Sequence, residues 1–127
     1  MNRLVELLLT LPEVCSVLAC LSRVELARHR QGPRPLLEAL RRRARFAPQR
    51  DALGRERLRR AIRWVDACMA GGGNCYRRSL LEITLDRGAR AEPFLMGFNL
   101  QGEQLSGHAW VAADSRGQEK YQFTVRL

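Results

Sequence analysis

Apolar side chains in the first part of the chain recur at the three- and four-residue spacing of helices. The leucines between Leu4 and Leu11 share one face, and the same period continues after Pro12 as far as Val24. Because proline breaks or bends a helix, this pattern predicts two short core helices or one helix kinked at Pro12.

A break follows at residues 31–35, where two prolines and a glycine cannot continue a helix. A third helix is expected to start at Leu36 and to be stopped by Pro48. A fourth, over about residues 53–69, places an apolar stripe on one face and arginines on the others. Residues 1–70 are therefore expected to be a helical, basic region that packs on the rest.

The pattern changes at Gly71-Gly72-Gly73-Asn74, a flexible loop that ends in a good helix N-cap residue. A helix over residues 75–87, stopped by Gly88, is followed by a strand-like period of two. The expected strands are about residues 93–100, 108–113 and 118–125, joined by turns at 101–103 and 114–117. The sequence thus predicts an α+β fold, with residues 71–127 forming a helix on a small antiparallel sheet. The two regions are expected to form one compact domain.

Length and charge limit the function classes. A chain of 127 residues that is 46% hydrophobic can bury one modest core. Lys+Arg exceed Asp+Glu by 22 to 13, and the excess lies mostly between Arg23 and Arg63, which predicts attraction to an acidic peptide, protein, nucleic acid or anionic membrane. Few aromatic residues interleave the basic run, and no helix-turn-helix or zinc spacing is present, so nucleic-acid binding is a weaker alternative.

The four cysteines stand at positions 15, 20, 68 and 75, without a CxxC pair or a histidine cluster, so neither a metal nor another cofactor is expected. Glu6, Pro12 and Glu13 interrupt the leucine-rich start, which argues against a secretory leader or a transmembrane segment. We therefore expect a cytoplasmic protein with free thiols, and we expect Trp64 and Trp110 in its core.

Cys75 is expected to be the first residue of a helix, where unpaired amides and the helix dipole favour a thiolate. His108, on a later strand, is suited to act as its base. Asp114, Glu119 and Gln122 are candidates for orienting the imidazole ring, and the hairpin register decides among them. The alternative is a cysteine that is simply a small buried hydrophobe and a histidine without a chemical role.

Four segments in this order resemble a known family. They are Asn74-Cys75-Tyr76-Arg77-Arg78-Ser79-Leu80-Leu81, Arg87-Gly88, Leu95-Met96-Gly97-Phe98 and Gly107-His108-Ala109-Trp110-Val111. Over about residues 72–125 the chain resembles the transglutaminase-like B protein of lasso-peptide biosynthesis, a leader peptidase of the papain-like cysteine protease superfamily.

The resemblance implies a cysteine peptidase that removes the leader from a ribosomally made precursor, with Cys75 as nucleophile and His108 as general base. The family's third residue is an Asp, and its place is taken here by Gln122, with Asp114 as a substitute if the turn is irregular. A second departure is Ala112, where family members commonly carry Glu. The implied partners are the precursor leader peptide, a small leader-recognition protein and a macrolactam-forming cyclase.

Two further interpretations remain open at this stage. An amide at position 122 cannot stabilise an imidazolium as a carboxylate does, so the chain could be a catalytically weakened scaffold that binds a precursor peptide or partner protein. The basic helices suit either outcome, because Arg42, Arg45, Arg59 and Arg63 could dock acidic residues of a leader or partner.

Overall fold

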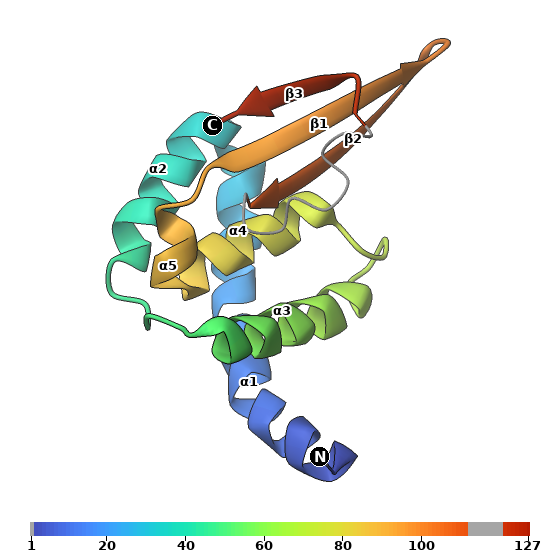
Figure 1. Ribbon diagram of the computed structural model, residues 1–127. Helices are drawn as coiled ribbons and strands as arrows, with labels where there is room; N and C mark the ends of the chain where they lie inside the picture. The colour runs from blue at the N-terminus through green and yellow to red at the C-terminus, as the bar shows by residue number, and fades with distance from the viewer. Residues whose placement is uncertain (1, 112–120) are drawn as a thin grey trace.

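The computed structural model describes residues 2–111 and 121–127, in which helices are followed by a small antiparallel sheet, as an α+β fold requires. Figure 1 shows the sheet lying across one side of the helices, with α4 directly beneath it. The elements are α1 (Arg3–Arg30), α2 (Pro33–Ala44), α3 (Ala52–Ala67), α4 (Cys75–Leu85), α5 (Arg87–Arg90), β1 (Phe94–Gln101), β2 (Gln104–Val111) and β3 (Phe123–Arg126).

The described strands are arranged in the order β2-β1-β3, with β1 in the centre and both neighbours antiparallel to it. Gly97 on β1 lies opposite His108 on β2 and Thr124 on β3. Strand β2 begins at Gln104, earlier than the sequence predicts, because the β1–β2 hairpin continues its pairing up to Gln101 and Gln104 at the turn. The predicted turn at 114–117 lies outside the described residues.

The core is one cluster of buried side chains to which α1, α2, α3, α4 and the sheet all contribute. Helix α4 is its centre, since Leu80, Leu81 and Ile83 are fully buried. Tyr76 of α4 packs edge-on against Phe94 of β1, with 5.9 Å between ring centroids. The helix that begins with Cys75 is therefore held on several sides.

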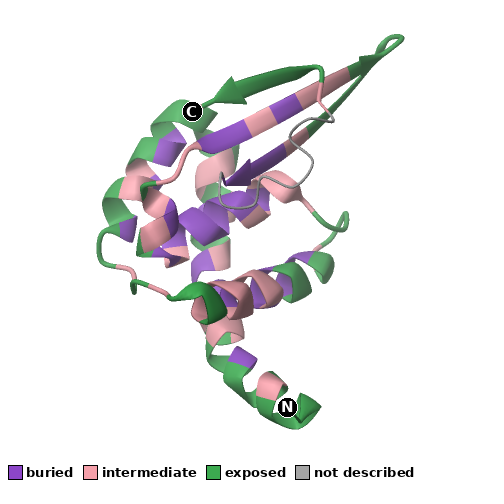
Figure 2. Ribbon diagram, viewed as in Figure 1, coloured by how far each residue is buried: buried purple, intermediate pink, exposed green. Residues whose placement is uncertain are grey.

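Helix α1 is one continuous element through Pro12, and the expectation of a core helix at its start is wrong. Val17, Cys20 and Val24 in its second half are core residues, whereas the large apolar side chains from Leu4 to Leu11 are exposed. Figures 1 and 2 show the reason, because the first turns of α1 extend beyond the helices that could cover them. By length and composition alone α1 could cross a membrane, but a core helix or a signal sequence near the N-terminus passes the same test, so the absence of a transmembrane segment stays a prediction.

Three local predictions are corrected by the structure. Helix α2 begins at Pro33 rather than Leu36, because a first-turn proline lacks only an N–H that would have no helical partner. Helix α4 ends at Leu85, and Asp86 starts the short α5 by accepting a hydrogen bond from the Gly88 amide at 2.9 Å. Trp64 was expected in the core, yet it is 42% exposed on α3.

Candidate active site

The glycine loop before α4 positions the first residue of that helix. Gly71 and Gly72 have φ values of 87° and 78°, which side-chain-bearing residues rarely adopt. The side chain of Asn74 then accepts a hydrogen bond from the Arg77 amide at 3.0 Å, as an N-cap residue does. Cys75 is consequently the first helical residue, where the sequence analysis placed it.

The buried carboxylate of Asp66 on α3 holds the glycine loop in place through hydrogen bonds. Asp66 of α3 is fully buried and accepts hydrogen bonds from Arg77 Nε at 2.6 Å, Arg78 Nη1 at 3.1 Å and the Asn74 amide at 2.8 Å. The sequence analysis missed this role, although one acidic residue beside the apolar stripe of an arginine-rich helix is a visible signal. Arg77 is buried against Asp66 and thus has a structural role.

Cys75 and Ser79, one helical turn apart, join α4 to the outer edge of β2. The Cys75 sulfur accepts a hydrogen bond from the Ala109 amide at 3.3 Å, and the Ser79 hydroxyl lies 3.2 Å from the Ala109 carbonyl oxygen, to which it can donate. These are the backbone groups that an edge strand leaves unpaired. Because Ala109 follows His108, this joint brings the sulfur to the part of the strand that carries the histidine.

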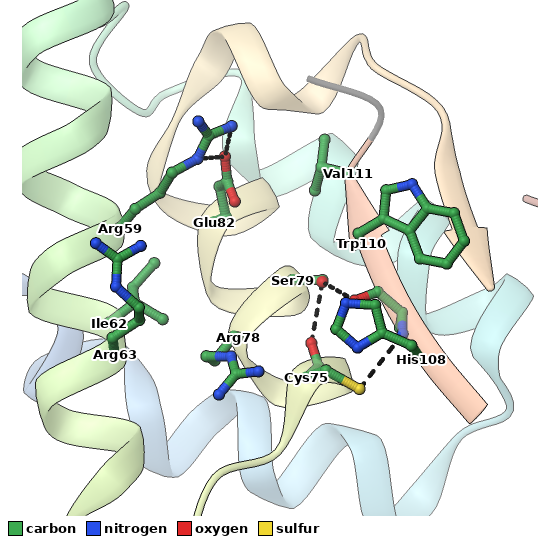
Figure 3. Close-up of a pocket in the computed structure, with 11 residues that line it drawn as sticks. Arg59, Ile62, Arg63, Cys75, Arg78, Ser79, Glu82, His108, Trp110 and Val111 are labelled. Atoms are coloured by element: carbon green, nitrogen blue, oxygen red, sulfur yellow. Dashed lines mark hydrogen bonds and ion pairs between the residues drawn. The ribbon is translucent and has the colours of Figure 1, made fainter. Parts of the chain in front are cut away.

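Cys75 and His108 both line an open cleft of about 210 Å³ between α3, α4 and β2. Arg59 and Arg63 of α3 form one side of it, and Glu82 of α4 lines it further along. Figure 3 shows the Cys75 sulfur pointing toward β2, on the side of the cleft where the His108 ring lies. The structure thus brings together the two residues that the sequence predicted as a pair.

Aromatic rings surround the imidazole of His108. The ring of Tyr121 is nearly parallel to it, with a centroid distance of 6.0 Å and an angle of 7°, and that of Trp110 lies at 5.6 Å and 19°. Tyr121 and Trp110 also contact each other, at 5.4 Å. The Tyr121 ring lies over Gly97, where a Cβ atom would overlap it. The sequence analysis missed Tyr121, because strand spacing alone does not show that contact.

The proposed orienting residue lies differently from the expectation. Gln122 is exposed, and its side-chain Oε1 accepts a hydrogen bond from the backbone amide of Leu100 at 3.0 Å. The backbone amide of Gln122 donates to Asn99 Oδ1 at 2.8 Å. The oxygen intended for the imidazole thus already binds the far end of β1, and a role at His108 stays a prediction. The other candidates, Asp114 and Glu119, lie outside the described residues, as does Ala112.

The four arginines predicted as one docking face are separated. Arg59, beside the cleft, pairs with Glu82 at 2.8 Å, and Arg63 pairs with Glu56 at 3.0 Å. Burial raises the pKa of Glu82, and Arg59 opposes that shift in part. Arg42 and Arg45 belong to the end of α2, outside the cleft lining, and the Arg45 guanidinium lies 4.5 Å from the Phe46 ring centroid.

All four cysteines are free thiols, so Cys68 forms no disulfide with Cys75. Cys15 and Cys68 are exposed, whereas Cys20 is buried, which raises the pKa of its thiol. Within residues 2–111 and 121–127 no group of three or more His, Cys, Asp or Glu side chains could hold a metal ion.

A cysteine at the start of a buried helix, next to a histidine-bearing edge strand of a small antiparallel sheet, defines a papain-like scaffold. The chain belongs to the transglutaminase-like superfamily, whose family model matches residues 15–123. That match extends from the middle of α1 to the first residue of β3. Comparisons with curated proteins and with solved structures gave no match.

Proposed function

We propose that this chain is a cysteine peptidase that removes the leader from a ribosomally synthesised, lasso-type precursor peptide. The observation that carries the proposal is the joint between α4 and β2, which holds the Cys75 sulfur on the Ala109 amide, next to His108 and facing an open cleft. A cleft open to solvent can admit an extended peptide, as leader removal requires.

The residues present can divide the reaction in the usual way of a Cys-His pair. His108 takes the thiol proton, and the Cys75 sulfur attacks the scissile carbonyl carbon. The Cys75 amide, a first-turn N–H without a helical partner, can donate to the oxyanion. His108 then protonates the leaving amine, which leaves an acyl-thioester on Cys75. His108 next takes a proton from water as the water oxygen attacks the thioester carbonyl carbon. The C–S bond then breaks, the leader leaves as a carboxylic acid, and His108 returns the proton to the Cys75 sulfur.

The aromatic surroundings support this role of His108. The faces of Trp110 and Tyr121 carry partial negative charge, so they stabilise an imidazolium that forms during the reaction. They also limit the rotation of the ring. This arrangement compensates in part for the amide that stands where the resembling family carries a carboxylate.

The proposal extends to partners. A leader-recognition protein would present the precursor, and a macrolactam-forming cyclase would act on the product. Arg63 is half-exposed at the cleft and remains accessible to acidic residues of the leader or of the recognition protein. A net charge of +9 attracts such an acidic partner over a distance.

Cleavage of the precursor tests the proposal. The protein is mixed with a lasso-type precursor peptide and its leader-recognition protein, and products are identified by mass spectrometry. Wild-type protein is expected to release an intact leader fragment. Cys75→Ala and His108→Ala are each expected to lower the rate by about 10³-fold or more, because each removes half of the reacting pair.

The matched control is Cys68→Ala, which removes an exposed thiol outside the cleft lining and should leave the rate unchanged. Equal cleavage by wild-type and Cys75→Ala proteins would remove Cys75 from the mechanism.

A second candidate function, a peptide-binding scaffold without catalysis, is favoured by the hydrogen bond that engages the Gln122 amide oxygen at Leu100. The same mixture distinguishes it. If the chain is a scaffold, the wild-type and Cys75→Ala proteins should bind the precursor with equal affinity, and neither should release a leader fragment.

A further inference from the structure

The first three turns of α1 expose an unusual number of large apolar side chains. Six of them, each between 42% and 61% exposed, form what we name the apolar arc: Leu4, Val5, Leu7, Leu8, Leu9 and Leu11. Figure 2 shows this end of α1 projecting from the molecule with most of its surface exposed. A contiguous exposed apolar surface of this kind marks an interaction site.

Three polar residues of the first turns of α1 face the protein. Glu6 pairs with Arg60 of α3 at 2.7 Å, Glu13 pairs with Arg50, and Thr10 is fully buried. At 100° per residue these three positions fall within an arc of about 60°. The first turns of α1 are therefore inverted relative to an ordinary surface helix, whose apolar face packs on the rest of the protein.

This inversion is fixed by the fold. Since the two ion pairs hold the polar side against α3 and the segment that follows α2, the apolar arc has to point outward. It covers about 200° of the helix circumference at 100° per residue. The match to the transglutaminase-like family begins at residue 15, so the arc lies outside the matched residues.

We infer that the apolar arc inserts into the interface of an anionic lipid bilayer and holds the protein at a membrane surface. A helix that docks in a protein groove needs a stripe of about 100°, half the width of this arc, whereas an interfacial helix can bury a broad apolar face among lipids. The acidic side chains of the segment are neutralised by arginines, and the chain carries a net charge of +9, which attracts anionic headgroups.

The segment lies on the membrane and does not span it. Although α1 is long and apolar enough to cross a bilayer, Val17, Cys20 and Val24 of its second half belong to the protein core. The second half of α1 is thus held in the fold, whereas the turns that carry the arc are free to meet lipid while the fold is intact. This inference does not depend on the chemistry of Cys75.

Vesicle flotation tests the inference with the full chain. Wild-type protein is expected to float with vesicles of equimolar phosphatidylglycerol and phosphatidylcholine, and to bind pure phosphatidylcholine vesicles more weakly. The triple variant Leu4→Gln, Leu8→Gln, Leu11→Gln should bind the anionic vesicles at least about tenfold more weakly, because it removes three apolar groups from the lipid contact. Circular dichroism should be unchanged, since all three side chains are exposed.

The matched control is Leu100→Gln, Leu105→Gln, which changes two exposed leucines near the tip of the β1–β2 hairpin. Its binding should equal that of wild-type. The inference is overturned if wild-type protein stays with the soluble fraction, if it binds both kinds of vesicle equally, or if the hairpin variant loses as much binding as the arc variant. It is also overturned if sedimentation shows a dimer that the arc substitutions abolish, since the arc would then contact a second copy.

Discussion

At the residue scale, the absence of a side chain on Gly97 leaves room for the Tyr121 ring beside His108. Gly97 is the β1 partner of His108, and the ring of Tyr121 occupies the space that a Cβ atom would take. Tyr121 is in turn nearly parallel to the imidazole. We therefore expect the position of His108 to depend on Gly97, a residue without a side chain.

A Gly97→Ala substitution tests this dependence. The added methyl group displaces the Tyr121 ring and with it the imidazole, so we expect kcat for leader removal to fall by about tenfold to a hundredfold with little change in KM. The measurement is steady-state cleavage of the precursor.

The controls for that experiment are two changes at position 121. Tyr121→Phe keeps the ring and should retain most of the activity, whereas Tyr121→Ala should match Gly97→Ala. Full activity of the alanine variant at position 121 would show that the ring does not position His108.

Residue identities alone revealed part of this site. The placement of Cys75 and His108 at one cleft was predictable, because a cysteine after a glycine loop and a histidine on a strand have recognisable chemistry. Their catalytic roles stay predictions. Tyr121 and Asp66 were not, because their roles arise from contacts across elements that a linear pattern does not specify. Gln122 was placed by counting along the chain, and its side chain instead binds the amide of Leu100.

At the element scale, the buried carboxylate of Asp66 joins α3 to α4, in addition to the Arg59–Glu82 ion pair. The Asp66 carboxylate accepts hydrogen bonds from Arg77, Arg78 and the backbone amide of Asn74. It therefore connects α3 with both the glycine loop and the start of α4. Arg77 completes its hydrogen bonds at the Gly72 carbonyl, 3.1 Å away. The direction in which α4 begins therefore depends on this carboxylate.

Replacing Asp66 by Asn should lower the free energy of unfolding by about 2 kcal/mol, because it weakens the charged hydrogen bonds of the buried Arg77 guanidinium and leaves Glu25, 3.5 Å away, as its remaining carboxylate partner. Urea denaturation followed by circular dichroism measures the change. The control, Asp51→Asn, removes a carboxylate at the exposed N-cap of α3, where Asn caps equally well, and should have little effect. A stable Asp66→Asn protein would mean that neighbouring groups or water replace the lost charge.

Element existence was easier to predict than element boundaries. The start of α4 was correct because Asn74 is a strong N-cap signal, whereas its end was misplaced because Asp86, and not Gly88, turns the chain. The start of α2 was misplaced because prolines were treated as breaks although the first helical turn accepts them.

At the scale of the whole molecule, the cationic groups are divided between surfaces. Arg63 lies at the cleft, while Arg42 belongs to α2, outside the cleft lining. The sequence showed a basic half of the chain but not which arginines would share a surface. It also missed the direction of the first turns of α1, because periodicity identifies an apolar face without saying whether the fold covers it.

Charge reversal at the two positions distinguishes the surfaces. Arg63→Glu should lower kcat/KM for the precursor bound to its recognition protein by about threefold to tenfold, since it places a like charge where acidic residues approach. Arg42→Glu makes the same change in net charge and should leave kcat/KM within error of wild-type at moderate salt. Equal losses in both would indicate a general effect of net charge instead of a docking position at the cleft.

The hydrogen bond from the Ala109 amide to the Cys75 sulfur means that the reactive sulfur also helps to hold β2 against α4. A thioester sulfur is a poorer acceptor than the thiolate that forms when His108 takes the thiol proton. Acylation of Cys75 would therefore weaken the contact between α4 and β2, and hydrolysis of the thioester would restore it. In each catalytic cycle, β2 would move slightly away from α4 when Cys75 is acylated and return when the acyl group is released.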